Sequence, residues 1–129
     1  MLSLARTTLA LTTLGTLTAC GGASVAMTPT PTPPVIPVSA ATVNATPALA
    51  FTPVEVHLLQ GGAVTFAFGT VGHNVYFDDD PDGAPEDIPG VNSNSTVTRV
   101  FTKPGTYSYD CHIHPGMQGT VAVVAPGSL

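Results

Sequence analysis

The sequence predicts an all-β protein, and three observations carry that prediction. The chain has 129 residues, a length that suits one domain with a single core. It contains 13 Gly and 13 Pro, and only 9% of its residues are charged, so a helical bundle is disfavoured. From about Thr42 onward, short runs of alternating apolar and polar residues are separated by Gly, Pro and Asn, a pattern typical of a β-sandwich or β-barrel.

Residues 1–20 have the composition of an export signal. Arg6 is followed by an apolar run, Leu9–Leu17, which is shorter than the roughly 20 residues that span a bilayer as a helix. The segment Leu17–Cys20 then resembles a bacterial lipobox, in which the cysteine becomes the lipidated first residue of the mature protein. We expect an exported protein, periplasmic or at the cell surface, held to a membrane by a lipid on Cys20. Plain secretion is the alternative.

Residues 21–40 are rich in Pro, Thr, Ala and Gly, as in Thr28–Pro34, and offer few side chains that could anchor a core. Such a segment is expected to be a disordered tether, and at about 3.1 Å per residue it could reach roughly 60 Å. It would hold the folded domain, expected at residues 41–126, at a distance from the membrane. An unselected low-complexity leader is the alternative.

Seven strands are expected in the folded domain, each with an alternation of period two. They are Thr42–Thr46, Val54–Leu59, Ala63–Phe68, His73–Phe77, Thr96–Phe101, Thr106–Cys111 and Thr120–Val124. Gln60–Gly62 is expected to form a hairpin, and Lys103–Gly105 a turn in which proline presets φ and glycine accepts a positive φ. Because Tyr109 and Cys111 fall on the apolar face, the thiol should point into the interior where its strand ends.

The segment after Tyr109 gathers a thiol, two imidazoles and a thioether, and its core has the spacing Cys111-x-x-His114-x-x-Met117. Soft sulfur with imidazole favours copper, whereas magnesium and calcium prefer oxygen. A blue-copper site needs two histidines and one cysteine in a trigonal plane with a long axial methionine, and the upstream His73 can supply the second imidazole. Zinc is the weaker alternative, because the thioether adds nothing to its usual donor set.

Two segments, Gly72–Asn74 and Tyr109–Gly119, together resemble the cupredoxin (type 1 blue copper) family, with a spacing closest to amicyanin-like members. The resemblance runs from about Thr42 to about Ala125. It implies a Greek-key β-sandwich that holds one copper ion. The implied ligands are His73, Cys111, His114 and Met117.

The same resemblance implies a function. The chain would cycle between Cu(II) and Cu(I) as a one-electron carrier between redox protein partners, and it would not be an enzyme. A copper-binding module that captures, stores or delivers the metal without a redox circuit is the alternative. The protein is expected to be a monomer.

Residues around the implied ligands also gain roles from the resemblance. Asn74 matches an asparagine that ties the two ligand-bearing loops together. His114 would expose one imidazole edge through an apolar patch of Ile113, Pro115 and Met117, and this edge would be the electron port. Plastocyanin-like members offer a second, remote route through a tyrosine just before the cysteine, and here that position is Asp110.

Two histidines, His57 and His112, remain outside this set. Multicopper oxidases and copper nitrite reductases pass electrons through a histidine next to the cysteine to a second copper centre. That centre needs several further imidazoles, and this chain has only His57 left, so both side chains are expected to face solvent. A disulfide between Cys20 and Cys111 would remove the thiolate that copper needs, so none is expected.

The charge is acidic after the signal is removed, since Arg99 and Lys103 stand against eight carboxylates and the formal charge is −6. Nucleic acid is therefore excluded as a partner, because phosphate binding needs clustered cations. The acidic loop Asp78–Gly83 imitates the start of a calcium loop, but Pro81 interrupts it and Pro89 cannot supply the last carboxylate. A solvated insertion that docks a basic partner is the preferred interpretation.

Overall fold

The computed structural model describes residues 29–78 and 82–128. The predicted signal, Cys20 and residues 21–28 of the predicted tether lie outside the described residues, as do residues 79–81 of the acidic loop. Residues 33–129 form one compact unit, and the described part of the other unit, residues 29–32, has no regular secondary structure. Over these described ranges, no helix is long and apolar enough to cross a membrane.

The described residues form eight strands, which confirms the all-β prediction. The strands are β1 (Val38–Thr46), β2 (Ala50–Thr52), β3 (Glu55–Phe68), β4 (His73–Phe77), β5 (Ile88–Asn92), β6 (Ser95–Val100), β7 (Gly105–Asp110) and β8 (Gln118–Val124). The fold therefore begins a few residues before the expected boundary at residue 41.

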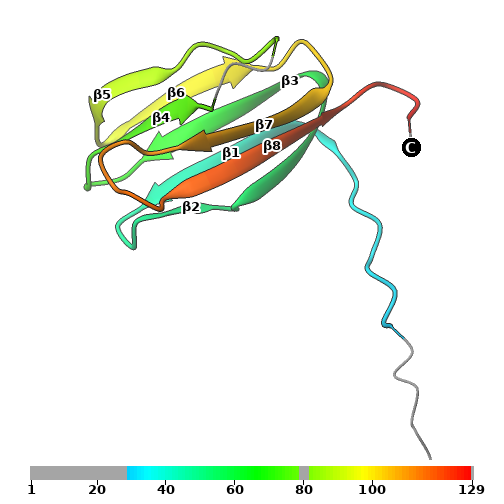
Figure 1. Ribbon diagram of the computed structural model, residues 1–129, viewed down its shortest axis with the longest axis horizontal. Helices are drawn as coiled ribbons and strands as arrows, with labels where there is room; N and C mark the ends of the chain where they lie inside the picture. Colours follow the sequence, from blue (N-terminus) through cyan, green and yellow to red (C-terminus); the bar gives the residue numbers. More distant parts are fainter. Residues whose placement is uncertain (1–28, 79–81, 129) are drawn as a thin grey trace, which may run out of the picture. The chain divides into compact units, whose positions relative to one another are not determined.

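Strand β3 joins the two layers of the sandwich (Figure 1). Its second half pairs in parallel with β1 and antiparallel with β6, and β1 also pairs with β2. Its first half pairs in parallel with β8, from which the pairing continues antiparallel through β7 and β4 to β5. One layer is thus β2-β1-β3-β6 and the other is β3-β8-β7-β4-β5.

The predicted hairpin at Gln60–Gly62 is wrong, because β3 passes through it without reversing. Gly61 has a φ of 81°, and the register of β1 against β3 shifts opposite this segment. The backbone N–H of Gly61 donates to the Phe101 carbonyl at 2.7 Å, and the Phe101 N–H donates to the Gly62 carbonyl at 2.9 Å. A glycine pair permits a bulge as well as a hairpin, and here the bulge lets one strand serve both layers.

Two strands were not expected. Strand β2 has only three residues, and β5 contains Pro89 and Gly90, which are typical of turns. Both lie at the edge of their layer, where proline is tolerated because one side of the strand needs no donor.

Tyr109 lies at the centre of the core. Its ring makes edge-to-face contacts with Phe51, Phe66 and Phe77, at centroid distances of 5.0, 5.3 and 5.9 Å. Its cross-strand neighbour is Gly119, where a Cβ would meet the phenol ring at 2.5 Å from Cζ. Gly119 is therefore required by the aromatic core that supports β7.

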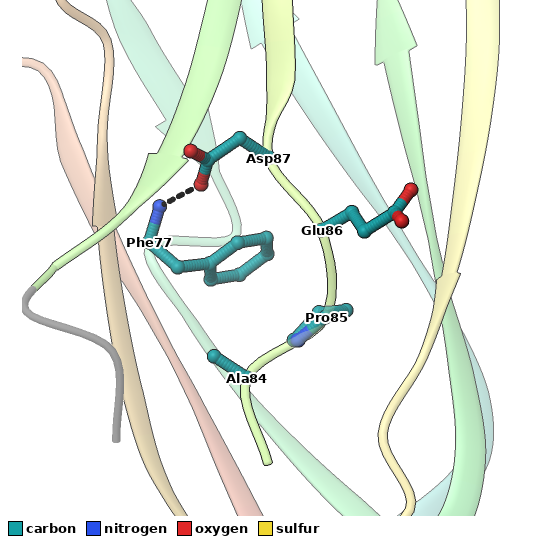
Figure 2. Close-up of a pocket in the computed structure, with 5 residues that line it drawn as sticks. All are labelled: Phe77, Ala84, Pro85, Glu86 and Asp87. Atoms are coloured by element: carbon teal, nitrogen blue, oxygen red, sulfur yellow. Dashed lines mark hydrogen bonds between the residues drawn. The ribbon is translucent and has the colours of Figure 1, made fainter. Parts of the chain in front are cut away.

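Arg99 fastens Glu86 and Asp87, which follow the acidic loop, to β6. Its Nε donates to the Glu86 carbonyl at 2.6 Å and its Nη2 to the Asp87 carbonyl at 2.8 Å. Asp87 in turn accepts from the Phe77 N–H at 2.9 Å, as Figure 2 shows beside a shallow pocket. These bonds hold the segment that leads from β4 into β5.

Candidate metal centre

The four predicted ligand residues come from two places that the strand pairing brings together. His73 begins β4, whereas Cys111, His114 and Met117 lie in the segment between β7 and β8. Because β4 pairs with β7, with Tyr76 opposite Asp110, the start of one strand meets the end of the other. Cys111 is 1% exposed just beyond the end of β7, which confirms that its thiol enters the interior.

Three donor atoms converge at this end of the sandwich. The Nδ1 atoms of His73 and His114 are 3.1 Å apart, and the Cys111 Sγ lies 3.9 Å from the first and 3.6 Å from the second. Nitrogen and sulfur donors that share one ion lie about 2.0–2.3 Å from it, so they are at most about 4–4.6 Å apart. The spacing therefore fits a single bound metal ion.

The ligand segment is closed by its own backbone. The Cys111 N–H donates to the Met117 carbonyl at 2.9 Å, and the Met117 N–H donates to the His114 carbonyl at 3.1 Å. Gly116 has a φ of 87°, a conformation that side-chain-bearing residues rarely adopt. Met117, which carries the fourth predicted donor, is buried.

Asn74 and Asn92 hold the two ligand-bearing segments. The buried Asn74 accepts a hydrogen bond from the His112 N–H at its Oδ1, at 2.8 Å, so its predicted bridging role is confirmed. Asn92 donates from Nδ2 to the His73 carbonyl at 3.2 Å. Sequence reasoning missed Asn92, because it lies on the unexpected β5 in a segment that resembles a turn.

Burial favours the neutral form of His73. It lowers the pKa of His73 below 6.5, and the nearby His114 charge lowers it further, while the Thr46 backbone acts in the opposite direction. A low pKa keeps the imidazole neutral near pH 7, which is the form that binds a metal. Burial also raises the pKa of Tyr109 well above its usual value, so this phenol stays neutral.

The predicted apolar patch around His114 is confirmed only in part. The side chain of His114 is partly exposed, and its neighbours Ile113 and Pro115 are exposed as expected. Met117 is 2% exposed and does not contribute to the surface. Met117 instead belongs to the buried core cluster of the sandwich.

His57 and His112 lie at the surface, as predicted. The His112 Nε2 is 3.2 Å from Asp110 Oδ1, and the His57 Nε2 is 3.2 Å from Glu55 Oε1. Among the described residues, the one group of three or more potential ligands is His73, Cys111 and His114. Residues 79–81 of the acidic loop lie outside the described residues, so the interpretation of this loop stays a prediction. Cys111 is a free thiol, and its predicted lack of a disulfide to Cys20 stays a prediction.

A β-sandwich that brings a thiol, two imidazoles and a buried thioether together at one end has the donor set of a copper protein. The comparisons agree. The model of the plastocyanin/azurin family of copper binding proteins matches residues 38–124, and the chain belongs to this family. Copper is thus its cofactor, as predicted.

Individual relatives are similar over part of their length. Amicyanin-alpha of Methylorubrum extorquens is 42% identical over 72 residues, a match that covers 54% of this chain and 60% of that relative. The reduced Cu(I) form of an amicyanin variant has a TM-score of 0.57 at 30% identity and covers 69% of this chain and 86% of its own. A copper-containing nitrite reductase from Thermus scotoductus has a TM-score of 0.57 at 29% identity, but the match covers only 23% of that chain.

Proposed function

We propose that this protein is a type 1 copper protein that carries single electrons between redox partners outside the cytoplasm. In this proposal the copper ligands are His73, Cys111, His114 and Met117. The observation that carries it is the convergence of the two Nδ1 atoms and the Sγ within 3.9 Å of one another. No enzymatic role is proposed, because the nitrite reductase match covers a minor part of that enzyme.

The bound copper ion would supply reversible one-electron chemistry between Cu(II) and Cu(I). The protein's contribution is to keep the donors in place. His73 is held by a paired strand, and the Asn74–His112 hydrogen bond joins the two ligand segments. The backbone bonds between Cys111 and Met117 close the loop. A cage that moves little on electron transfer makes a fast carrier, and the exposed edge of His114 gives a partner access.

The N-terminal part adds a location to this proposal. Residues 1–20 would direct export, a lipid on Cys20 would anchor the mature chain, and residues 21–40 would be the tether before the copper domain. The lipobox-like Leu17–Cys20 supports this arrangement. A Cys20→Ser variant should appear in the soluble exported fraction, whereas the unchanged chain should partition with membranes. Equal partitioning of both would contradict the anchor.

The function is tested by adding one equivalent of Cu(II) to the metal-free protein and recording visible absorption, then reducing and reoxidising it. The expected result is an intense blue band that disappears and returns. Cys111→Ser should lose the band, and Cys20→Ser, which changes the other cysteine, should keep it. A colourless protein that surrenders its copper to a mild chelator would instead indicate capture or delivery of the metal.

A further inference from the structure

A bulge in β5 lies beside the start of β4. The two strands pair at His73, which lies opposite Asn92, and at Val75, which lies opposite Ile88. Residues 89–91, the β5 bulge, therefore stand opposite a single residue of β4. The bulge begins with a proline, which has no N–H to donate, and its middle glycine has a φ of 78°. Extra residues of this kind disrupt the ladder locally, so regular pairing alone does not fix the two strands here.

The Asn92 side chain joins the bulge to β4. Its Nδ2 donates to the His73 carbonyl at 3.2 Å and to the Pro89 carbonyl at 3.1 Å. A side-chain amide has two N–H hydrogens, and here each has one carbonyl to meet. The two bonds tie the bulge to the peptide unit of a predicted copper ligand.

Val91, the last residue of the bulge, covers the residue before that ligand. The valine is 74% exposed, yet a Cβ added to Gly72 would collide with its Cγ1. The same Cβ would lie 3.8 Å from the Val91 Cβ, which is an ordinary contact, so one methyl group alone makes the position tight. Two neighbouring residues of β5 therefore hold the Gly72–His73 segment, one by packing and one by hydrogen bonds.

His73 is the one predicted ligand outside the segment from Cys111 to Met117. That segment is closed by its own backbone bonds, whereas His73 depends on the neighbours of its strand. Strand β4 lies between β7 and β5, and Asn74 supports it on the β7 side. The β5 bulge is the support on the other side. Without it, the imidazole whose Nδ1 lies 3.1 Å from that of His114 would be free to shift.

We propose that the β5 bulge and Asn92 clamp the His73 imidazole in place, with Asn92 as a positioning residue of the copper site. The inference rests on the proposed copper function. Asn92 does not touch the metal ion and acts through the peptide unit of His73. A ligand held in this way moves little when copper changes between Cu(II) and Cu(I), so the clamp favours fast electron transfer.

The first test needs no copper. Backbone order parameters of the metal-free protein are measured by NMR relaxation. The His73 amide should have a value of about 0.85, typical of rigid backbone, and should fall toward about 0.6 in Asn92→Ala. Ser93→Ala, which changes the exposed neighbour, is the matched control and should keep the value. An order parameter that is unchanged in Asn92→Ala would overturn the clamp.

The second test uses the copper-loaded protein. Asn92→Ala, and Asn92→Asp, which has no N–H to donate, should weaken copper affinity by about 10–100-fold in a chelator competition and change the blue band. Gly72→Ala should do the same, because its methyl group meets Val91 Cγ1. Val91→Ala removes that atom, so the double variant Gly72→Ala with Val91→Ala should recover the affinity and spectrum of Val91→Ala.

The outcomes separate the two proposals. If Asn92→Ala lowers only the free energy of unfolding and keeps the copper affinity and spectrum, the bulge is merely structural and the clamp is overturned while the copper function stands. A double variant as impaired as Gly72→Ala would also overturn it, and this pair decides the question should Asn92→Ala not fold. Absence of a reversible blue centre in the unchanged protein would overturn the proposed function, and the order parameters would still show whether the bulge holds His73.

Discussion

Gly119→Ala should destabilise the protein, because the added methyl group would enter the space of Tyr109. A Cβ at this position would lie 2.5 Å from Cζ and 2.8 Å from Cε2 of the phenol ring, and still closer to its hydroxyl oxygen. The ring cannot retreat, since Phe51, Phe66 and Phe77 pack around it. Overpacking of this kind costs about 1–3 kcal/mol of the free energy of unfolding.

The assay is urea unfolding of the metal-free protein, followed by fluorescence or circular dichroism. In a thermal melt, a loss of 1 kcal/mol in the free energy of unfolding should lower the melting temperature by about 4–8 °C for a domain of this size. Gly69→Ala is the matched control, because a Cβ there would meet nothing closer than the Ala45 carbonyl at 3.9 Å. If Gly119→Ala unfolds at the same urea concentration as the control, the packing argument is wrong.

Tyr109→Phe provides the second half of this test. The Tyr109 hydroxyl is buried and has no hydrogen-bond partner among the described residues, so its removal should be neutral or stabilise the protein by up to about 1 kcal/mol. Because the hydroxyl is the atom nearest to the added methyl group, Tyr109→Phe should recover part of the loss caused by Gly119→Ala. Strict additivity of the two changes would contradict the proposed contact.

Three further predictions concern the site and the acidic loop. Asn74→Ala should weaken copper affinity by about 10–100-fold in a chelator competition, because the two ligand segments lose their bridge; an unchanged affinity would remove Asn74 from the support of the site. Arg99→Met should lower the free energy of unfolding in urea by about 1 kcal/mol, because the carbonyls of Glu86 and Asp87 lose their donor. Lys103→Met, which breaks a surface ion pair, should change it by less than about 0.5 kcal/mol. The metal-free protein should lose stability as the pH falls from 6.5 through the lower folded-state pKa of His73, because the unfolded chain then binds the proton more readily. The slope of the free energy of unfolding against pH should flatten in His73→Gln. An equal slope in the variant would assign the pH dependence to another group.

Most of the candidate site could be predicted from local sequence. The spacing of Cys111, His114 and Met117 lies within one short loop, and the alternation of β7 directs the thiol inward. The distant His73 was a candidate because copper needs a second imidazole, but nothing local indicates which strand lies beside β7. Its position follows from the pairing of β4 with β7.

Features that depend on register could not be predicted. The stack of Tyr76 on His112 exists because Tyr76 lies opposite Asp110, and neither residue carries a local signal of that contact. Gln60–Gly62 fits a hairpin and a bulge equally well as sequence, and the pairing of both halves of β3 decides between them. The burial of Met117 likewise had no local signal, because the two residues before it are exposed.

The central claim is that one copper ion is bound by two imidazoles and one thiolate from two segments of the sandwich. Anomalous diffraction from crystals of the copper-loaded protein, measured at the copper absorption edge, tests it most directly. The account predicts one strong peak among the Nδ1 atoms of His73 and His114 and the Sγ of Cys111. A peak at surface carboxylates or at His57, with none at this position, would contradict it.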